Sequence, residues 1–260
     1  MKGKGRLEEV ARFFRQREEL GAGDLYMDGL TRDEALAFVA DRTGNAVPVG
    51  RSATQASSPT EAEIAPSPTP DTLDLSALDY DALRQAAMGC QRCRLARDRS
   101  NVVFSDGNPT ARLMVVGEAP GANEDRTGLP FVGQAGKLLD LMLASIDLSR
   151  RDSVYICNVL KCRPPGNRDP MQDEIESCSP YLKRQIELVA PEVILAVGTF
   201  SAKLLTGASK PLGRLRGEIY SYEGVPLIVT YHPAALLRNR GWTRPAWDDL
   251  QLLRQVLDNR

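Results

Sequence analysis

The segment Leu113-Met-Val-Val-Gly-Glu-Ala-Pro-Gly121 decides the fold, because a short apolar run ends there in polar and turn-forming residues. Three further runs of this kind follow it along the chain, at Val154–Cys157, Val193–Val197 and Leu227–Thr230. Each run is rich in β-branched residues and nearly continuous, which is typical of a parallel sheet covered on both faces. We therefore predict a three-layer α/β/α domain with a four-stranded parallel sheet. Helices are expected between the strands at Ala135–Ile146, Asp173–Val189 and Thr199–Leu205.

The part of the chain before this domain has a different composition. Residues 6–43 indicate two short helices, the second starting at a capping box, Thr31-Arg-Asp-Glu34. The next residues are rich in Pro, Ser, Thr and Ala with few large apolar groups, a composition that cannot offset chain entropy by burial. We therefore expect a helical extension (residues 1–45), a disordered linker (residues 46–74) and a folded domain (residues 75–260).

The charge of the chain is unevenly distributed. Residues 1–89 carry 10 Lys and Arg against 15 Asp and Glu, whereas residues 90–260 carry 23 against 19. The folded part is therefore mildly basic, which permits DNA binding without demonstrating it. The sequence contains no signal-peptide core and no run of 18 apolar residues. We expect a cytoplasmic protein that makes no membrane contact.

Four of the five cysteines fall into two separated pairs. Cys90 and Cys93 form a CxxC motif, and Cys162 and Cys178 have 15 residues between them. Four thiolates in two groups suit either zinc or an iron–sulfur cluster, and the wide second pair favours a cluster. Cys157 ends an apolar run, so we interpret it as a small core residue.

Polar residues with useful chemistry follow the ends of the expected strands. They are Glu118 after the first strand, Asn158 after the second, Thr199 after the third and His232 after the fourth. Ligands of open parallel sheets bind outside the carboxyl ends of the strands. The sequence therefore predicts an active site at this edge.

The motifs that identify the family lie between residues 88 and 258. They are Cys90-x-x-Cys93, Gly117-Glu-Ala-Pro-Gly121, Glu124-Asp125, Gly128-Leu-Pro-Phe-Val-Gly133, Asn158, Lys161-Cys-Arg-Pro-Pro165 with Asn167-Arg168, Cys178 and His232-Pro-Ala234. In order and spacing this region resembles the family 4 uracil-DNA glycosylases, the thermophile-type enzymes with a [4Fe–4S] cluster. The resemblance implies that Cys90, Cys93, Cys162 and Cys178 hold the cluster. It also implies an enzyme that flips uracil from DNA, hydrolyses its N-glycosidic bond and leaves an abasic site.

Three features separate this chain from neighbouring families. Glu118 stands where family 5 enzymes usually carry an apolar residue, so it favours family 4. The stretch from Cys162 to Cys178 has no histidine, unlike that of the relatives that trap uracil-DNA covalently. Ala119 occupies the place of the water-orienting aspartate of the cluster-free enzymes. The group that activates water therefore stays open.

The resemblance implies catalytic roles for Glu118, Asn158 and His232. His232 would donate a hydrogen bond to uracil O2, and Asn158 would read N3–H and O4. Phe131 would stack on the flipped base. Glu118 either positions water or shapes its loop. The remaining residues expected at the base are Gly117, Ala119 and Glu124.

DNA contacts are expected from an apolar wedge and from arginines. Leu236 would fill the gap that the flipped base leaves, although Leu236 and Leu237 also fit an ordinary helix start. Arg163, Arg168 and Arg238 would contact the DNA backbone, and Arg92 and Arg94 lie near the first cysteine pair.

Two alternative functions account for fewer of these sequence features. One is a glycosylase of broader range that also removes hypoxanthine, and the other is a zinc-binding interaction module without activity. As partners we expect uracil-containing DNA, single- or double-stranded, for a monomer associated with the nucleoid. The N-terminal extension could recruit a repair or replication protein, or it could be neutral.

Overall fold

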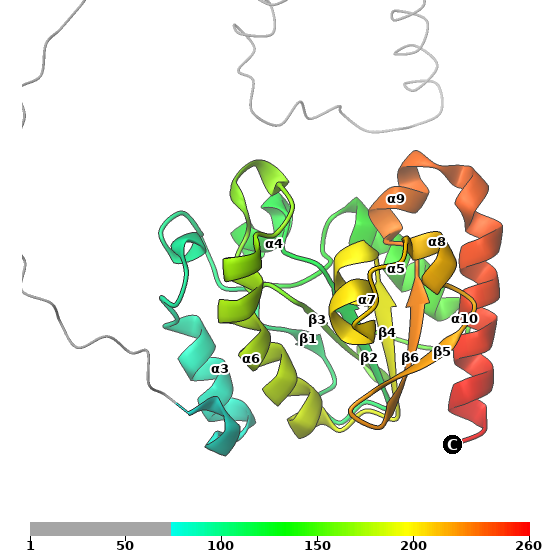
Figure 1. Cartoon of the computed structure of the whole chain (residues 1–260), viewed down its shortest axis with the longest axis horizontal. Coiled ribbons are helices and arrows are strands. Elements are labelled where there is room, and N and C mark those ends of the chain that lie inside the picture. Colours follow the sequence, from blue (N-terminus) through cyan, green and yellow to red (C-terminus); the bar gives the residue numbers. More distant parts are fainter. Residues whose placement is uncertain (1–73) are drawn as a thin grey trace, which may run out of the picture. The chain divides into compact units, whose positions relative to one another are not determined.

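The computed structural model describes residues 74–260. The expected N-terminal helices and the linker up to residue 73 lie outside this range. Within it, a sheet lies between two layers of helices, as predicted (Figure 1). No helix of this described part is long and apolar enough to cross a membrane.

The sheet has six strands rather than the four expected, in the order β1-β3-β2-β4-β6-β5. The four predicted strands form its parallel centre. The additional strands β1 and β5 pair antiparallel at the two edges. Their bounds are β1 (Asp106–Gly107), β2 (Leu113–Gly117), β3 (Val154–Asn158), β4 (Val193–Val197), β5 (Ile219–Tyr222) and β6 (Val225–Thr230).

The central strands are apolar throughout because helices cover both faces of the sheet. Every residue of β2, β3 and β4 is buried. Alternate residues point to opposite faces and divide the core into two clusters. One cluster contains Met114, Val116, Ile194 and Val229, and the other contains Leu113, Val115, Leu195 and Ile228.

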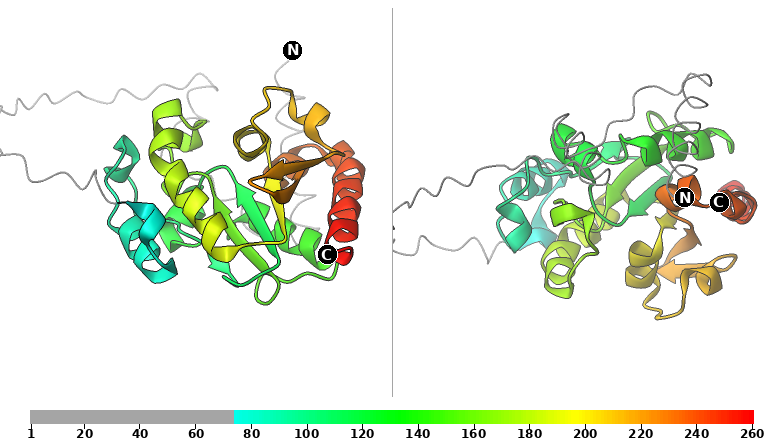
Figure 2. Two further views of the ribbon diagram at one scale, coloured as in Figure 1. Left: turned by 60° about the horizontal axis from the view of Figure 1, so that its bottom comes forward. Right: turned by 90° about the horizontal axis from the view of Figure 1, so that it is seen from above.

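The helices pack in two layers, which the views of Figure 2 separate. One layer, against Met114 and Val116, contains α3 (Tyr80–Met88), α6 (Gln172–Val189), α7 (Thr199–Thr206) and α8 (Leu212–Leu215). The other, against Leu113 and Val115, contains α5 (Gln134–Ala144), α9 (Pro233–Arg238) and α10 (Thr243–Asp258). The helices expected between the strands are present as α5, α6 and α7, with ends within two residues of the prediction.

Short elements connect these layers at the edges of the domain. The remaining helix is α4 (Ala122–Thr127), and the single 3₁₀ turns are η1 (Leu75–Ala77), η2 (Arg94–Ala96), η3 (Pro165–Asn167) and η4 (Arg240–Trp242).

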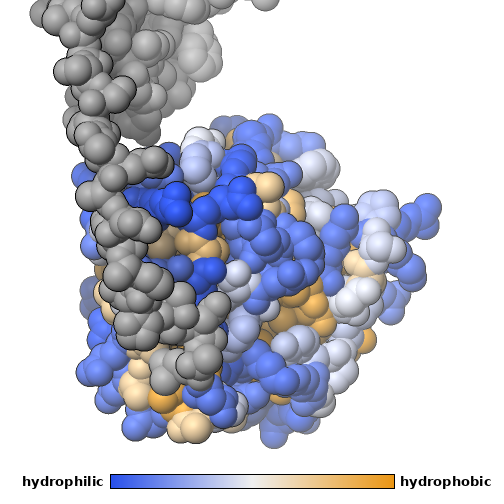
Figure 3. All heavy atoms as spheres, turned by 60° about the vertical axis from the view of Figure 1, so that its left-hand side comes forward, coloured by the Kyte–Doolittle hydropathy of each residue, from blue (hydrophilic) through white to orange (hydrophobic). Residues whose placement is uncertain are grey.

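The face on the side of α3 is mostly hydrophilic, with small hydrophobic areas (Figure 3). The segments after β2, β3, β4 and β6 all leave the sheet at its carboxyl edge, where the predicted site residues lie.

Candidate active site

The ends of β2, β3 and β6 meet at the carboxyl edge of the sheet. Gly117 stands opposite Asn158 in the strand register. A Cβ added at Gly117 would lie 2.3 Å from Asn158 Oδ1 and 2.6 Å from Phe131 Cζ. Phe131 in turn stacks on His232, with ring centroids 5.5 Å apart and an interplanar angle of 28°. Four residues from distant parts of the chain therefore form one site, and its centre requires a glycine at position 117.

Asn158 contributes an unpaired polar atom to this site. The residue is 2% exposed, and its Oδ1 is buried without a hydrogen-bond partner. An unpaired buried carbonyl costs about 1–3 kcal/mol of stability. Such a cost is typical of a functional site, where a ligand's N–H supplies the missing donor.

The Phe131 ring is presented by a strained backbone. Its φ of 54° lies in the left-handed region, which a bulky residue rarely adopts. The turn also passes very close to α5, because a Cβ at Gly136 would lie 1.7 Å from the Phe131 carbonyl oxygen. The loop keeps this shape only if surrounding contacts hold it.

Arg150 provides such contacts, and no motif in the sequence pointed to it. Its Nη1 donates to the Pro130 carbonyl at 2.9 Å, and its Nη2 donates to the Phe131 carbonyl at 2.7 Å. Asp106 and Asp140 accept hydrogen bonds from the same guanidinium, each at 2.9 Å. Arg150 is therefore fixed on two sides and holds the turn that carries the stacking ring.

Glu124 holds the same loop from the other end. Its Oε1 accepts hydrogen bonds from the N–H groups of Val132 and Gly133, both at 2.9 Å. Its Oε2 accepts from the Gly121 N–H at 3.1 Å. The carboxylate thus joins the start of α4 to the Phe131 loop. These contacts of Glu124 are structural, and its expected contact with the base stays a prediction.

His232 has one defined donor. Its Nδ1 accepts a hydrogen bond from the Ala234 N–H at 3.1 Å, so the proton of the neutral ring sits on Nε2. Burial, with a further contribution from Arg238, lowers the pKa of His232 to about 4. The imidazole is therefore neutral near pH 7 and donates from Nε2. Gly198, at the end of β4, permits the close packing, since a Cβ there would lie 3.2 Å from His232 Cβ.

Glu118 is the titratable group next to this centre. Burial and the nearby carboxylate of Asp169 raise the pKa of Glu118 to about 7. Its backbone carbonyl accepts from the Leu160 N–H at 3.0 Å, which fixes the chain at the end of β2. Ala119 follows it, packs against the core and brings no polar side chain. Among these neighbours Glu118 is the group that can exchange a proton near neutral pH.

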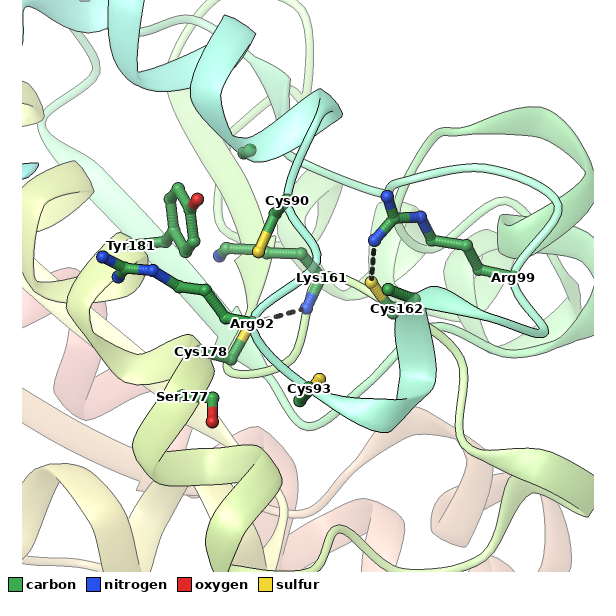
Figure 4. Close-up of a pocket in the computed structure, with 11 residues that line it drawn as sticks. Cys90, Arg92, Cys93, Arg99, Lys161, Cys162, Ser177, Cys178 and Tyr181 are labelled. Atoms are coloured by element: carbon green, nitrogen blue, oxygen red, sulfur yellow. Dashed lines mark hydrogen bonds between the residues drawn. The ribbon is translucent and has the colours of Figure 1, made fainter. Parts of the chain in front are cut away.

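The four predicted cysteine ligands line one cavity (Figure 4). Arg99 Nη1 donates to Cys162 Sγ, and the Lys161 backbone N–H donates to Cys178 Sγ, both at 3.3 Å. Cys157 is fully buried in the core, as expected. Among the described residues, no group of three or more His, Cys, Asp or Glu could hold a single metal ion.

Lys161 connects this cavity to Asn158. The lysine lines the cavity and is 2% exposed. Its Nζ donates to the Asn158 backbone carbonyl at 2.6 Å. The backbone of the expected base-reading residue is therefore held by a side chain that reaches the cysteine cavity, a link that spacing in the sequence does not reveal.

The expected wedge residue is not at the surface. Leu236 is 5% exposed and packs in the core cluster beneath α9. The neighbouring Leu237 is 51% exposed and is available for a contact with DNA. The wedge role of Leu236 therefore stays a prediction, and Leu237 is the exposed alternative beside it.

The arginines expected to contact DNA differ in exposure and in the hydrogen bonds that they already form within the protein. Arg168 forms a two-pronged hydrogen bond with the buried Glu174, at 2.8 and 2.5 Å. Arg163 donates to Asn167 at 2.7 Å. Arg238 is exposed at the end of α9 and close enough to His232 to affect its pKa. Arg168 therefore has a structural contact as well, whereas Arg238 is exposed beside the site, and all three DNA contacts stay predictions.

The protein is an α/β domain whose site, at the carboxyl edge of the sheet, combines stacking rings with a buried hydrogen-bond acceptor. Such a site can bind a flat polar ring such as a nucleobase. The model of the Uracil DNA glycosylase superfamily matches residues 104–251 and gives the class. A Type-4 uracil-DNA glycosylase of Sulfurisphaera tokodaii is 42% identical over 184 residues, which are 68% of this chain and 84% of the relative. Another, of Archaeoglobus fulgidus, is 47% identical over 165 residues, 60% of this chain and 82% of the relative. A Type-5 uracil-DNA glycosylase of Pyrobaculum aerophilum is 33% identical over 195 residues, 62% of this chain and 85% of the relative. The chain belongs to the type-4 uracil-DNA glycosylases.

Proposed function

We propose that this chain removes uracil from DNA by hydrolysing its N-glycosidic bond, leaving an abasic site. One observation carries the proposal: the buried, unpaired Oδ1 of Asn158 beside the stacked rings of Phe131 and His232. A base in a duplex cannot reach such a site, so it must be extruded first. The uracil N3–H is a donor that fits the orphan oxygen. Cytosine has no N3–H, and it would leave that oxygen unpaired.

The reaction requires stabilisation of negative charge on the departing uracil. The Nε2–H of neutral His232 is the donor that we assign to uracil O2. A fixed donor in a water-poor site stabilises developing charge strongly, because it needs no reorientation during the reaction. Phe131 would cover the base and exclude water from this contact.

The water that attacks the sugar needs a polar partner. Glu118 has a pKa of about 7, which suits a group that orients water and accepts its proton near neutral pH. Ala119 cannot serve in this way. We therefore propose that Glu118 positions the water; the alternative, that Glu118 shapes the loop, predicts no effect on the pH dependence of excision.

We further propose that Cys90, Cys93, Cys162 and Cys178 hold a [4Fe–4S] cluster. The four thiols line one cavity, and four cysteine thiolates are the usual ligands of a [4Fe–4S] cluster. The buried ammonium of Lys161 also favours an anionic centre, and four thiolates of a cluster provide one. When bound, the cluster crosslinks η2, α6 and the loop after β3, and so stabilises that part of the domain.

The cluster proposal is tested separately from activity. Cys178→Ser, purified without oxygen, should contain much less iron and unfold at a lower temperature than the wild-type protein. Cys157→Ser is the matched control, because this thiol lies in the core and should leave the iron content unchanged. Equal iron in both variants would contradict the ligand assignment.

The function is tested with oligonucleotides that contain a single uracil, thymine or hypoxanthine. We expect alkali-labile breaks at uracil alone, and their loss in Asn158→Ala and His232→Ala. Excision of hypoxanthine at a comparable rate would favour the broader glycosylase. No excision by iron-loaded protein would contradict the proposal.

The setting of the enzyme is proposed from its substrate. We infer a cytoplasmic monomer that works on chromosomal DNA, with the N-terminal extension as a contact for a repair or replication protein. Deletion of residues 1–73 should leave excision from short oligonucleotides unchanged, because the described domain contains all the assigned residues.

A further inference from the structure

An exposed tryptophan lies on a rigid base next to the active site. Trp242, at the end of η4, is 38% exposed. Its ring stacks on Tyr231 with centroids 4.7 Å apart and an interplanar angle of 11°. Tyr231 directly precedes His232 in the chain, so its backbone adjoins the base pocket, and Trp242 lies in the connection from α9 to α10 (Figure 1).

The stack is anchored in the core through an arginine. The Arg216 guanidinium lies 4.2 Å from the Tyr231 ring centroid, on the face opposite Trp242, since one face cannot hold both groups at these distances. Arg216 Nε donates to Asp249 Oδ2 at 2.7 Å, and Thr230 donates to the same oxygen at 2.6 Å. The tryptophan therefore rests on two fixed layers, and its accessible surface belongs to a preorganised plane.

Two exposed arginines lie close to Trp242 in the chain. Arg238 and Arg240 lie on either side of the turn into η4 and are exposed. Neither forms an ion pair with a carboxylate in the part of the chain that the structure describes. An exposed aromatic ring with exposed arginines two and four residues before it in the chain is typical of a site for single-stranded nucleic acid, where bases stack and phosphates meet positive charge.

We propose that Trp242 is a stacking site for an unpaired nucleotide that neighbours the uracil in the same DNA strand. Arg238 and Arg240 contact the adjacent phosphates. This rests on the proposed function for the position of the uracil, but stacking itself requires no uracil. The site gives the enzyme affinity for single-stranded or locally opened DNA regardless of sequence, because every base has a flat face.

The test uses the fact that the chain has two tryptophans, Trp242 and Trp247. Trp247→Phe leaves Trp242 as the only indole, and a uracil-free oligothymidylate should quench its fluorescence in a saturable manner. In the matched variant Trp242→Phe, the remaining Trp247 should not respond. Trp242→Ala should weaken binding of the same oligonucleotide roughly tenfold, whereas Trp242→Phe should retain most of it.

The outcomes separate this proposal from the proposed function. Unchanged emission from Trp242 in a protein that excises uracil would overturn the stacking site and leave the function intact. Quenching that requires uracil in the strand would also overturn it, because Trp242 would then report events in the pocket. Saturable quenching by uracil-free DNA in a protein without excision would support the stacking site and contradict the function.

Discussion

Arg150 should control excision through the Phe131 loop, although it lies outside the base pocket. We consider Arg150→Gln, which removes the two-pronged hydrogen bonding to the Pro130 and Phe131 carbonyls. Hydrogen bonds from a charged group contribute about 1.5–3 kcal/mol each. The left-handed Phe131 backbone costs roughly 1–3 kcal/mol, which these hydrogen bonds offset.

A glutamine can keep at most one of the two hydrogen bonds, so the strained conformer is destabilised by about 1.5–3 kcal/mol relative to relaxed ones. Each 1.4 kcal/mol lowers the ratio of competent to relaxed loop about tenfold. Because the rate follows the competent fraction, we expect the single-turnover rate at subsaturating enzyme to fall by up to roughly a hundredfold. Arg150→Lys keeps the positive charge beside Asp106 and Asp140 but loses the planar guanidinium that donates two hydrogen bonds to the loop. Its excision rate should therefore lie between the rates of the wild-type protein and Arg150→Gln.

A double-mutant cycle decides whether Arg150 acts through the ring. Phe131→Ala removes the stacking face, so Arg150→Gln should cost little further activity in that background. The assay is single-turnover excision on one uracil oligonucleotide, with thermal unfolding of each variant as the control for folding. The same loss of rate in both backgrounds would refute the reasoning, since Arg150 would then act independently of Phe131.

Three other properties of the site can be measured directly. Because folding raises the pKa of Glu118 from 4.5 to about 7, the folded state holds its proton longer, and stability should fall as pH rises through this window. In chemical denaturation, Glu118→Gln should remove that part of the pH dependence of stability. The excision rate of the wild-type protein should rise with a midpoint near pH 7, and Glu118→Gln should flatten this rise. An unchanged rate profile would exclude Glu118 as the proton acceptor. Asn158→Asp should lower the preference for uracil over cytosine by at least tenfold in matched oligonucleotides, and retention of full preference would exclude its role in base reading. Leu236→Ala should cost about 2–5 kcal/mol in the free energy of unfolding, whereas Leu237→Ala should leave stability nearly unchanged and slow excision from duplex DNA more than from single strands. The reverse pattern, measured by urea unfolding and paired substrates, would support Leu236 as the wedge.

The centre of the fold was predictable because fully buried parallel strands leave continuous apolar runs in the sequence. The edge strands leave no such mark. β1 has only two residues, and β5 alternates between exposed and half-buried positions. Both depend on pairing with a neighbouring strand, which local composition does not encode.

For the site as well, residues fixed by local sequence and topology could be predicted, whereas residues that depend on tertiary contacts could not. Residues at strand ends, such as Asn158 and His232, could be placed because the topology fixes where they emerge. Arg150 could not, because its contacts with Pro130 and Phe131 span about 20 residues of loop and helix. The exposure of Leu237 instead of Leu236 depends on the rotation of α9, which its short sequence does not determine.

The two core clusters on opposite faces of the sheet have an evolutionary consequence. Cys162 and Cys178 belong to one cluster, and Phe131 and Leu236 belong to the other. Substitutions in separate packing layers usually act additively, so selection can alter one layer without repacking the other. A lineage could therefore gain, lose or remodel the cysteine-lined half while it conserves base recognition, and Lys161 marks a position where such a change would need compensation.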